Sequence, residues 1–586
     1  MATGATAMPN GAILGLEYWW SRSSRYEALL VSGNDENAKA AIPVTPVSQA
    51  GIDSLGLEPL HSGWVRTSRF KAKSGEVCLL PSAQGGVARV LLGLGPSAAG
   101  GEPWPFAALA KLPGGVYRLE AVADGSSSGG GGGGGEDAAA QAAVAAAAAA
   151  VADRAALGFL LGHYAFERYK ASGSGATATP AGAAAAVGAA AGGDAEAEAG
   201  AEAKPRLVWP AGANRTQVAA LARGFVWARD LITTPAEDLG PQHLAAEAAA
   251  LAAAHGASFR VLQGDELLEH NYPAIHTVGR ASYRPPLLAT IEWSPPGAEG
   301  SAAGGEPLPV LALVGKGVCF DTGGLDLKPA ASMKNMKKDM GGAALVLALA
   351  HAVMAARLRC RLRVLVPAVE NSVGGNAFRP LDVLHTRAGI TVENGNTDAE
   401  GRLILADALA DALGRDCRNA NDTTTATTAT TATTAPTAAT ANDPNFQLPD
   451  LLIDAATLTG AARVALGADL PAVFANDDDT WRALEAAAAA AGDPVWRLPL
   501  HAPYRKSLDS KIADLSSTGA GDGLGGAIIA ALFLQEFVRG APRWLHIDTN
   551  AFNVGVAVGP GRPEGGEAQG LRALFAMISA RYGAAA

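Results

Sequence analysis

Cysteine is scarce in this chain. The 586 residues include four cysteines, and no two of them have the C-x-x-C spacing of a thiolate zinc site or a redox dithiol. They are Cys78, Cys319, Cys360 and Cys417. This scarcity excludes a disulfide framework and is typical of a reducing compartment. We therefore expect any metal ion to be held by carboxylate and nitrogen ligands.

Charged residues are also few, and basic residues are fewer than acidic ones. Charged residues make up 17% of the chain, and 46 Lys and Arg face 56 Asp and Glu, for a formal net charge of −10. The acidic balance argues against broad binding to nucleic acid or to anionic membranes, because both need an excess of basic residues. These totals still allow a local basic patch.

From the sequence we expect neither a membrane span nor a secretion leader. Its longest apolar run, residues 138–152, is mostly alanine, which is too weakly apolar for a span, so we expect a surface-packed helix. The N-terminus has no basic segment followed by an apolar one, so we expect a cytoplasmic protein. The alternative is a plastid or other organelle, because residues 1–25 carry no acid except Glu17 and end in SRSSR, as a transit peptide could.

The length exceeds what a single core accommodates, so we expect two domains. We divide the chain into an N-terminal extension (1–38), a smaller α/β domain (39–170), a low-complexity Ala/Gly linker (171–205) and a larger domain (206–586). A Thr/Ala-rich insertion, 418–447, interrupts the larger domain, and we predict that it is a disordered surface segment.

Strands and helices alternate along the larger domain. Apolar strand-like runs are separated by helical ones, which predicts an α/β fold whose central, mostly parallel (mixed) sheet is flanked by helices. The expected strands are 286–293, 309–315, 361–369 and 450–457, and the expected helices are 343–358 and 403–413.

Two stretches, Gly315–Gly342 and Asn396–Arg402, concentrate charge within apolar, glycine-rich sequence, where unpaired charges are costly. The charged residues that we single out from them are Lys316, Asp321, Lys328, Asp339, Asp398, Glu400 and Arg402. Lys316 directly follows a predicted strand, and ligands bind beyond the carboxyl ends of strands in open parallel sheets. Neither GxxxxGK[ST] nor GxGxxG is present here, which argues against a phosphate-binding or dinucleotide loop.

The second stretch has two interpretations. Asp398 and Glu400 could simply favour the start of the helix that follows, through its macrodipole. Alternatively, an extended segment would aim both carboxylates to one side. Four carboxylates and two lysines exceed what helix capping needs, so we favour a paired site for Zn²⁺, Mn²⁺ or Mg²⁺ with bridging carboxylates. A lysine could ligate there only as the neutral amine.

The order of these motifs resembles the leucyl aminopeptidases of the M17 type, which are two-metal exopeptidases. The motifs are GKGVCFDTGG, MKKDMGG, ENSVGGNAFRP, NTDAEGR, DAATLTGA, WRLPL and LDSKIADL, and the resemblance covers Arg206 to Tyr582. The first domain resembles the family only loosely.

The resemblance implies a role for each charged residue. Lys316, Asp321, Asp339 and Glu400 would ligate the tighter metal ion, and Asp321, Asp398 and Glu400 the more exchangeable one. A water between the two ions would be the nucleophile, and the free α-amine would bind a metal ion and Asp339. Lys328 would polarise the scissile carbonyl, and Arg402 would hold a bicarbonate that acts as general base.

The same resemblance places Met336, Thr457 and Gly460 around the first side chain of the substrate, with backbone at Leu458 and Gly460 positioning the peptide. Asn550 and Asn553 stand where better-known members have small or apolar residues, so we expect a more polar pocket.

Two further departures lie outside the proposed ligands. Leu381 replaces the glycine of the family's RPGD turn, and Thr233 replaces the asparagine of its NTP segment.

The implied protein is a homohexamer whose active sites face an interior cavity and act on short peptides with a free N-terminus. Two alternatives belong to other classes: a non-catalytic relative kept for binding, and a DNA-binding or chaperone-like relative.

Overall fold

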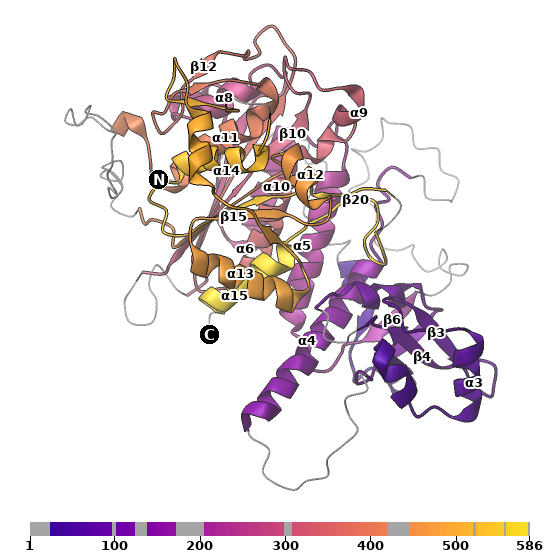
Figure 1. The fold of residues 1–586 in the computed structure, drawn as a ribbon. Coiled ribbons are helices and arrows are strands. Elements are labelled where there is room, and N and C mark those ends of the chain that lie inside the picture. The colour runs from indigo at the N-terminus through magenta and orange to yellow at the C-terminus, as the bar shows by residue number, and fades with distance from the viewer. Residues whose placement is uncertain are drawn as a thin grey trace, which may run out of the picture. The chain divides into compact units, whose positions relative to one another are not determined.

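The computed structural model describes residues 24–96, 101–123, 138–170, 204–297, 307–419, 446–519, 523–555 and 558–583. The chain divides into two compact units, shown in Figure 1. The smaller comprises Tyr26–Ala99 and Trp104–Ala213, and the larger contains Gly100–Pro103 and Asn214–Ala586. Most of the predicted extension, linker and Thr/Ala-rich insertion falls outside the described residues.

The smaller unit is built on a mixed sheet of strand order β1-β6-β5-β2-β4-β3, in which β3 alone among the described pairs runs antiparallel. Its elements are β1 (Leu30–Val31), α2 (Glu36–Lys39), β2 (Ile42–Val47), η1 (Gln49–Ser54), α3 (Pro59–Thr67), β3 (Val77–Pro81), β4 (Val87–Gly93), η2 (Trp104–Lys111), β5 (Gly115–Leu119), α4 (Ala138–Gly162) and β6 (Pro205–Val208). Strand β6 belongs to this sheet, so residues 205–213 lie with the smaller unit.

The larger unit contains the central sheet, with the order β16-β15-β18-β14-β9-β11-β8-β7 and β10 added beside β11. Its strands are β7 (Ser258–Gln263), β8 (Leu287–Trp293), β9 (Val310–Gly315), β10 (Gly317–Asp321), β11 (Arg361–Asn371), β14 (Leu451–Ala456), β15 (Ala472–Ala475), β16 (Trp496–Arg497) and β18 (Trp544–Asp548). Strands β11, β9, β14 and β18 are parallel neighbours, whereas β7, β8 and β15 join antiparallel. The predicted mixed α/β sheet is therefore confirmed.

Helices cover this sheet (Figure 1). One group is α5 (Arg215–Thr233), α6 (Pro241–His255), α10 (Gly341–Ala355), α13 (Asp478–Ala491) and α15 (Leu571–Tyr582), and the other is α8 (Pro273–Gly279), α11 (Glu400–Ala412) and α14 (Gly526–Phe537). Shorter elements are α7 (Glu266–Glu269), α9 (Ala330–Met333), η3 (Met336–Met340), β12 (Val383–Leu384), β13 (Val392–Glu393), η4 (Thr397–Ala399), η5 (Cys417–Asn419), α12 (Gly460–Leu466), η6 (Ala502–Leu508), β17 (Leu515–Ser516), β19 (Phe552–Asn553) and β20 (Gly565–Gly566).

The hydrophobic core of the larger unit explains why these helices pack against the sheet. Leu405, Leu409, Phe533 and Trp544 pack into one buried cluster between α11, α14 and the sheet. Removing such apolar side chains from water is the main driving force for this arrangement.

Two described helices, Gln141–Gly162 and Met336–Ala355, are long and apolar enough to cross a membrane by length and composition. In the second, 94% of the apolar window is buried inside the fold, as in the core helices of many proteins without a membrane span.

Leu381 is a point of backbone strain. Its φ is +68°, in the left-handed region. Its side chain is 66% exposed, so side-chain packing does little to stabilise this conformation. Side chains other than glycine adopt this conformation at a cost of about 1–2 kcal/mol.

We therefore expect Leu381→Gly to raise the free energy of unfolding by about 1 kcal/mol, measured by urea denaturation. Leu268→Gly is the matched control, because Leu268 is an exposed residue within helix α7 and has no positive φ. The control should lower stability by about 0.5–1 kcal/mol. Equal changes in the free energy of unfolding for the two substitutions would contradict backbone strain at Leu381.

Candidate active site

Several parallel strands of the larger sheet end at or just before polar residues, which lie along one edge of the sheet. Strand β9 leads into Lys316, β10 ends on Asp321, and β14 leads into Thr457. Strands β9 and β10 pair with successive parts of β11, and Lys316 lies at the break between them. The backbone N–H of Lys316 donates to Ala455 O on β14, which fixes the break against the neighbouring strand.

Glycine lets the first turn of α11 approach this lysine. A Cβ at Gly401 would lie 2.6 Å from Cε and 2.7 Å from Nζ of Lys316. Any larger residue at 401 would have to displace the lysine, so the close approach depends on glycine.

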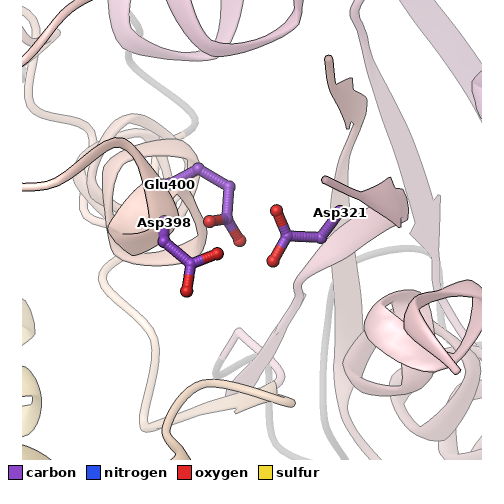
Figure 2. Close-up of side chains that lie close together, drawn as sticks. All are labelled: Asp321, Asp398 and Glu400. Atoms are coloured by element: carbon purple, nitrogen blue, oxygen red, sulfur yellow. The ribbon is translucent and has the colours of Figure 1, made fainter. Parts of the chain in front are cut away.

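Three carboxylates converge from the two sides of this edge. Asp321 comes from the end of β10, Asp398 from the 3₁₀ turn η4, and Glu400 from the first residue of α11. One oxygen of each lies within 4.8 Å of the others, and Figure 2 shows the three groups facing one another. Of the two conformations considered for this stretch, the helix start is the one present, and a 3₁₀ turn running into the helix brings the two carboxylates together.

Two lysines bridge these carboxylates in pairs. Lys316 Nζ lies 2.7 Å from Asp339 Oδ2, 2.9 Å from Glu400 Oε1 and 3.1 Å from Thr457 O. Lys328 Nζ lies 2.8 Å from Asp321 Oδ2 and also contacts Asp398 Oδ1. The structure thus brings the four carboxylates and two lysines of the two stretches into one cluster.

Burial and mutual repulsion set the protonation of the cluster. Burial and the charge of Asp321 raise the pKa of both Asp398 and Glu400, and burial raises the pKa of Asp339. Burial alone would lower the pKa of Lys316, but the charges of Asp339 and Glu400 outweigh it and raise that pKa. The two lysines therefore offset only part of the burial and repulsion that disfavour the charged carboxylates.

Arg402 lines the cavity beside the cluster. Its Nη1 donates to Ser517 O at 2.7 Å, and its Nε makes no hydrogen bond within the described structure. Burial lowers the pKa of Arg402 to about 10, which still leaves the guanidinium charged at neutral pH. A cationic group with an unused N–H can bind an anion.

Asn371, which sequence reasoning missed, joins the two halves of the cluster. It is fully buried at the end of β11, and its Nδ2 donates to Asp321 Oδ1 at 2.9 Å and to Thr397 O at 3.0 Å, with Glu400 Oε2 at 3.4 Å. The same strand-end rule that selected Lys316 and Asp321 would have found it, because Asn371 is the polar residue on which an apolar strand ends.

A cavity of about 580 Å³ opens beside the cluster. Among its lining residues are Met336, Thr457, Leu458, Gly460 and Asn550, all predicted from the sequence.

The 457–460 loop is held from behind by Asp548. The carboxylate of Asp548 accepts the N–H groups of Leu458 and Thr459 at 3.0 and 3.1 Å, and the hydroxyl of Thr459. The N–H of Leu458 is therefore already used within the protein.

The two pocket asparagines have different positions. Asn550 lies in the cavity wall, where its Oδ1 accepts from Lys338 Nζ at 2.7 Å. Asn553 is fully buried outside the cavity lining, and its Nδ2 donates to Pro563 O and to Glu567 Oε2, each at 3.0 Å. Of the two asparagines, Asn550 is therefore the one that adds to the polarity of the cavity, together with Lys338, which sequence reasoning had not singled out.

The donor set suits divalent cations. Asp321, Asp339, Asp398 and Glu400 outnumber the two lysine ammonium groups by two to one, and their oxygens are hard ligands. Asn371 Oδ1 is buried beside them without a hydrogen-bond partner in the described structure. An excess of buried negative charge is what bound dications would neutralise.

Comparison with known proteins decides the family. The model of the catalytic domain of the cytosol aminopeptidase family matches residues 226–575. The chain belongs to the cytosol aminopeptidase family. The model of the M17 aminopeptidase N-terminal domain matches residues 42–128 of the smaller unit. The resemblance predicted from the sequence is therefore confirmed.

Individual relatives support the same family assignment. Peptidase B of Pectobacterium carotovorum is 43% identical over 331 residues, which cover 56% of this chain and 67% of that protein. A crystal structure of the cytosol aminopeptidase from Coxiella burnetii matches with a TM-score of 0.72 and 36% identity, over 95% of this chain and 100% of the other. The bottromycin maturation enzyme BotP in complex with Mn matches with a TM-score of 0.68 and 29% identity, over 92% and 100%. These relatives identify a metallo-aminopeptidase hydrolase.

Replacing Asn371 should loosen the metal centre. We expect Asn371→Leu, which removes the amide at similar volume, to weaken Mn²⁺ binding by about 10- to 100-fold, because such supporting hydrogen bonds orient ligating carboxylates. Titration calorimetry measures this affinity directly. Asn476→Leu is the control, since Asn476 bonds Trp544 and Ala541 outside the cavity lining. Unchanged Mn²⁺ affinity in a folded Asn371→Leu protein would contradict the role.

Proposed function

We propose that this member of the family removes N-terminal residues from short peptides by using two divalent cations, Mn²⁺ or Zn²⁺ with Mg²⁺ as the other candidate. The observation that carries the proposal is the convergence of four carboxylates and two lysines beside a cavity of about 580 Å³.

Five residues would hold the cations: Lys316, Asp321, Asp339 and Glu400 for the tighter ion, and Asp321, Asp398 and Glu400 for the exchangeable one. Bound there, two cations supply a water nucleophile of lowered pKa and polarise a carbonyl. Lys316 would ligate as an amine, because a dication at its carboxylate partners favours loss of its proton.

Lys328 would stabilise the oxyanion of the tetrahedral intermediate. Its ammonium lines the cavity and is held by Asp321 and Asp398, the carboxylates assigned to the exchangeable ion. Once those carboxylates face a cation, the lysine is free to donate to a substrate carbonyl.

Arg402 would bind bicarbonate as the general base that carries a proton to the leaving amine. Its free Nε and buried guanidinium support this assignment. Asp339, which also lines the cavity, would accept the substrate α-amine, which accounts for a requirement for an unblocked N-terminus.

We also propose a homohexamer and a cytoplasmic location. The description of the matching family and of the Coxiella burnetii relative as cytosol aminopeptidases supports the location. All seven proposed metal and catalytic positions carry suitable side chains, which speaks against a non-catalytic relative.

Removing one metal-site carboxylate or the oxyanion lysine should abolish most turnover. We expect Glu400→Gln and Lys328→Ala each to lower kcat on a leucine amide by at least about 10²-fold, and a chelator to remove activity that Mn²⁺ restores. Glu247→Gln is the matched control, because this buried carboxylate accepts a hydrogen bond from Trp227 away from the cavity lining.

Near-normal activity of either variant would overturn the role of that residue. Chelator-resistant turnover in the unmodified protein would overturn the metal-dependent mechanism.

A further inference from the structure

A second cavity lies at the opposite end of strand β11 from the carboxylate cluster. Its volume is about 430 Å³, within the range of about 300–1,000 Å³ that small-molecule sites occupy. Arg363, the third residue of β11, lines it, whereas Asn371, the last residue of that strand, bonds the cluster. The strand between these two residues spans roughly 26 Å. Among the described residues, none lines both cavities, so this is a separate site.

One wall of the second cavity is a face of the central sheet. Arg260 on β7 lies opposite Thr290 on β8, and Glu292 on β8 lies opposite both Ser258 on β7 and Arg363 on β11. Side chains of directly opposite residues project from the same face of a sheet, as do those two residues apart on one strand. All five residues line the cavity. The register of the sheet therefore presents Arg260 and Arg363 to the same space.

Three arginines of this cavity are held by two aspartates. The carboxylate of Asp411 lies 3.0 Å from Arg363 Nη2 and 3.2 Å from Arg387 Nη2. The carboxylate of Asp416 lies 3.4 Å from Arg387 Nη1 and 3.3 Å from Arg418 Nη2. Burial would raise the pKa of Asp416, but its bonds to Arg418 and the charge of Arg387 outweigh burial and lower that pKa. The three guanidinium groups are thus fixed in place by charged partners before any ligand binds.

The arginines of the cavity outnumber its carboxylates. The lining contains four arginines and three acids: Arg260, Arg363, Arg387 and Arg418 against Glu292, Asp411 and Asp416. Arg260 is exposed and makes no ion pair in the part of the chain that the structure describes. The Nε atoms of Arg363 and Arg387 are buried without a hydrogen-bond acceptor among the described residues. The cavity therefore has a surplus of positive charge and of N–H donors, although the chain as a whole has a net charge of −10.

A phosphate group matches this array better than a carboxylate. The planar guanidinium group of arginine binds phosphate through paired N–H donors. A phosphate offers three oxygens and up to two negative charges, so it can contact several guanidinium groups at once. Phe259, Leu262 and Tyr272 line the same cavity, which therefore accommodates an organic group beside the phosphate.

We propose that this cavity binds a phosphate group, free or as part of a small phosphate ester, between Arg260 and the three arginines held by Asp411 and Asp416. The site goes beyond the proposed aminopeptidase function, because none of its residues takes part in that function. Helix α11 nevertheless connects the two places, since its first residue is Glu400 and Asp411 is its second-to-last.

Titration calorimetry on the full-length protein, dialysed to remove unbound cations, tests this site with four probes. They are inorganic phosphate, adenosine 5′-monophosphate, adenosine and succinate. We expect both phosphate-bearing probes to bind, and adenosine and succinate to bind at least about 10-fold more weakly than the monophosphate, because they lack the charge-assisted bonds of a phosphate. The affinity of inorganic phosphate relative to the monophosphate distinguishes a site for the free ion from one for an ester.

Substitutions locate the binding. Arg260→Gln should weaken the monophosphate by about 10-fold or more, since it removes a guanidinium group without breaking an ion pair of the fold. Arg260→Lys should weaken it less, because the charge remains. Arg482→Gln is the matched control, because this exposed arginine pairs with Asp479 and is outside the cavity lining. The control should keep the affinity of the unmodified protein, and circular dichroism checks that each variant is folded.

Three outcomes would overturn the inference. The first is no saturable binding of either phosphate-bearing probe. The second is binding that a folded Arg260→Gln protein leaves unchanged, which would assign the phosphate to another site, such as Arg402 or the carboxylate cluster. The third is adenosine or succinate that binds as tightly as the monophosphate. All three are measured without peptide turnover, so they leave the proposed function to its own test.

Discussion

The cluster of buried carboxylates is the constraint on which the rest of the site depends. Like charges at this separation in a desolvated setting repel, which is why the pKa values of Asp398 and Glu400 are raised. Lys316 and Lys328 relieve only part of the repulsion. The site is thus stable to the extent that cations are supplied, so folding of this edge and metal binding are linked.

The sheet provides the geometry for that cluster by breaking a strand. Because β9 and β10 pair with successive parts of one long strand, β11, the chain can project Lys316 at the break and Asp321 five residues later. Asn371, at the end of the same β11, then bonds Asp321 and lies beside Glu400. A single strand therefore aligns both sides of the carboxylate cluster, and a register shift in it would separate them.

The sequence predicted the features that follow from periodicity and strand ends, and missed those that depend on local turns. The alternation of strands and helices indicated the mixed sheet, and glycine-bounded charges indicated the cluster. Two conformations stayed open at 398–400, because a 3₁₀ turn and an extended segment can both bring nearby carboxylates together. Lys338 was overlooked for a related reason: three lysines occur between 334 and 338, and only the turn decides which one is buried.

Lys337 and Lys338 show how one short turn directs two adjacent lysines to different segments of the fold. The two adjacent ammonium groups bind carbonyl groups of different segments, Lys337 that of Thr233 and Lys338 that of Asn550. Lys338 is also the neighbour of Asp339, so its positive charge opposes cations at the cluster.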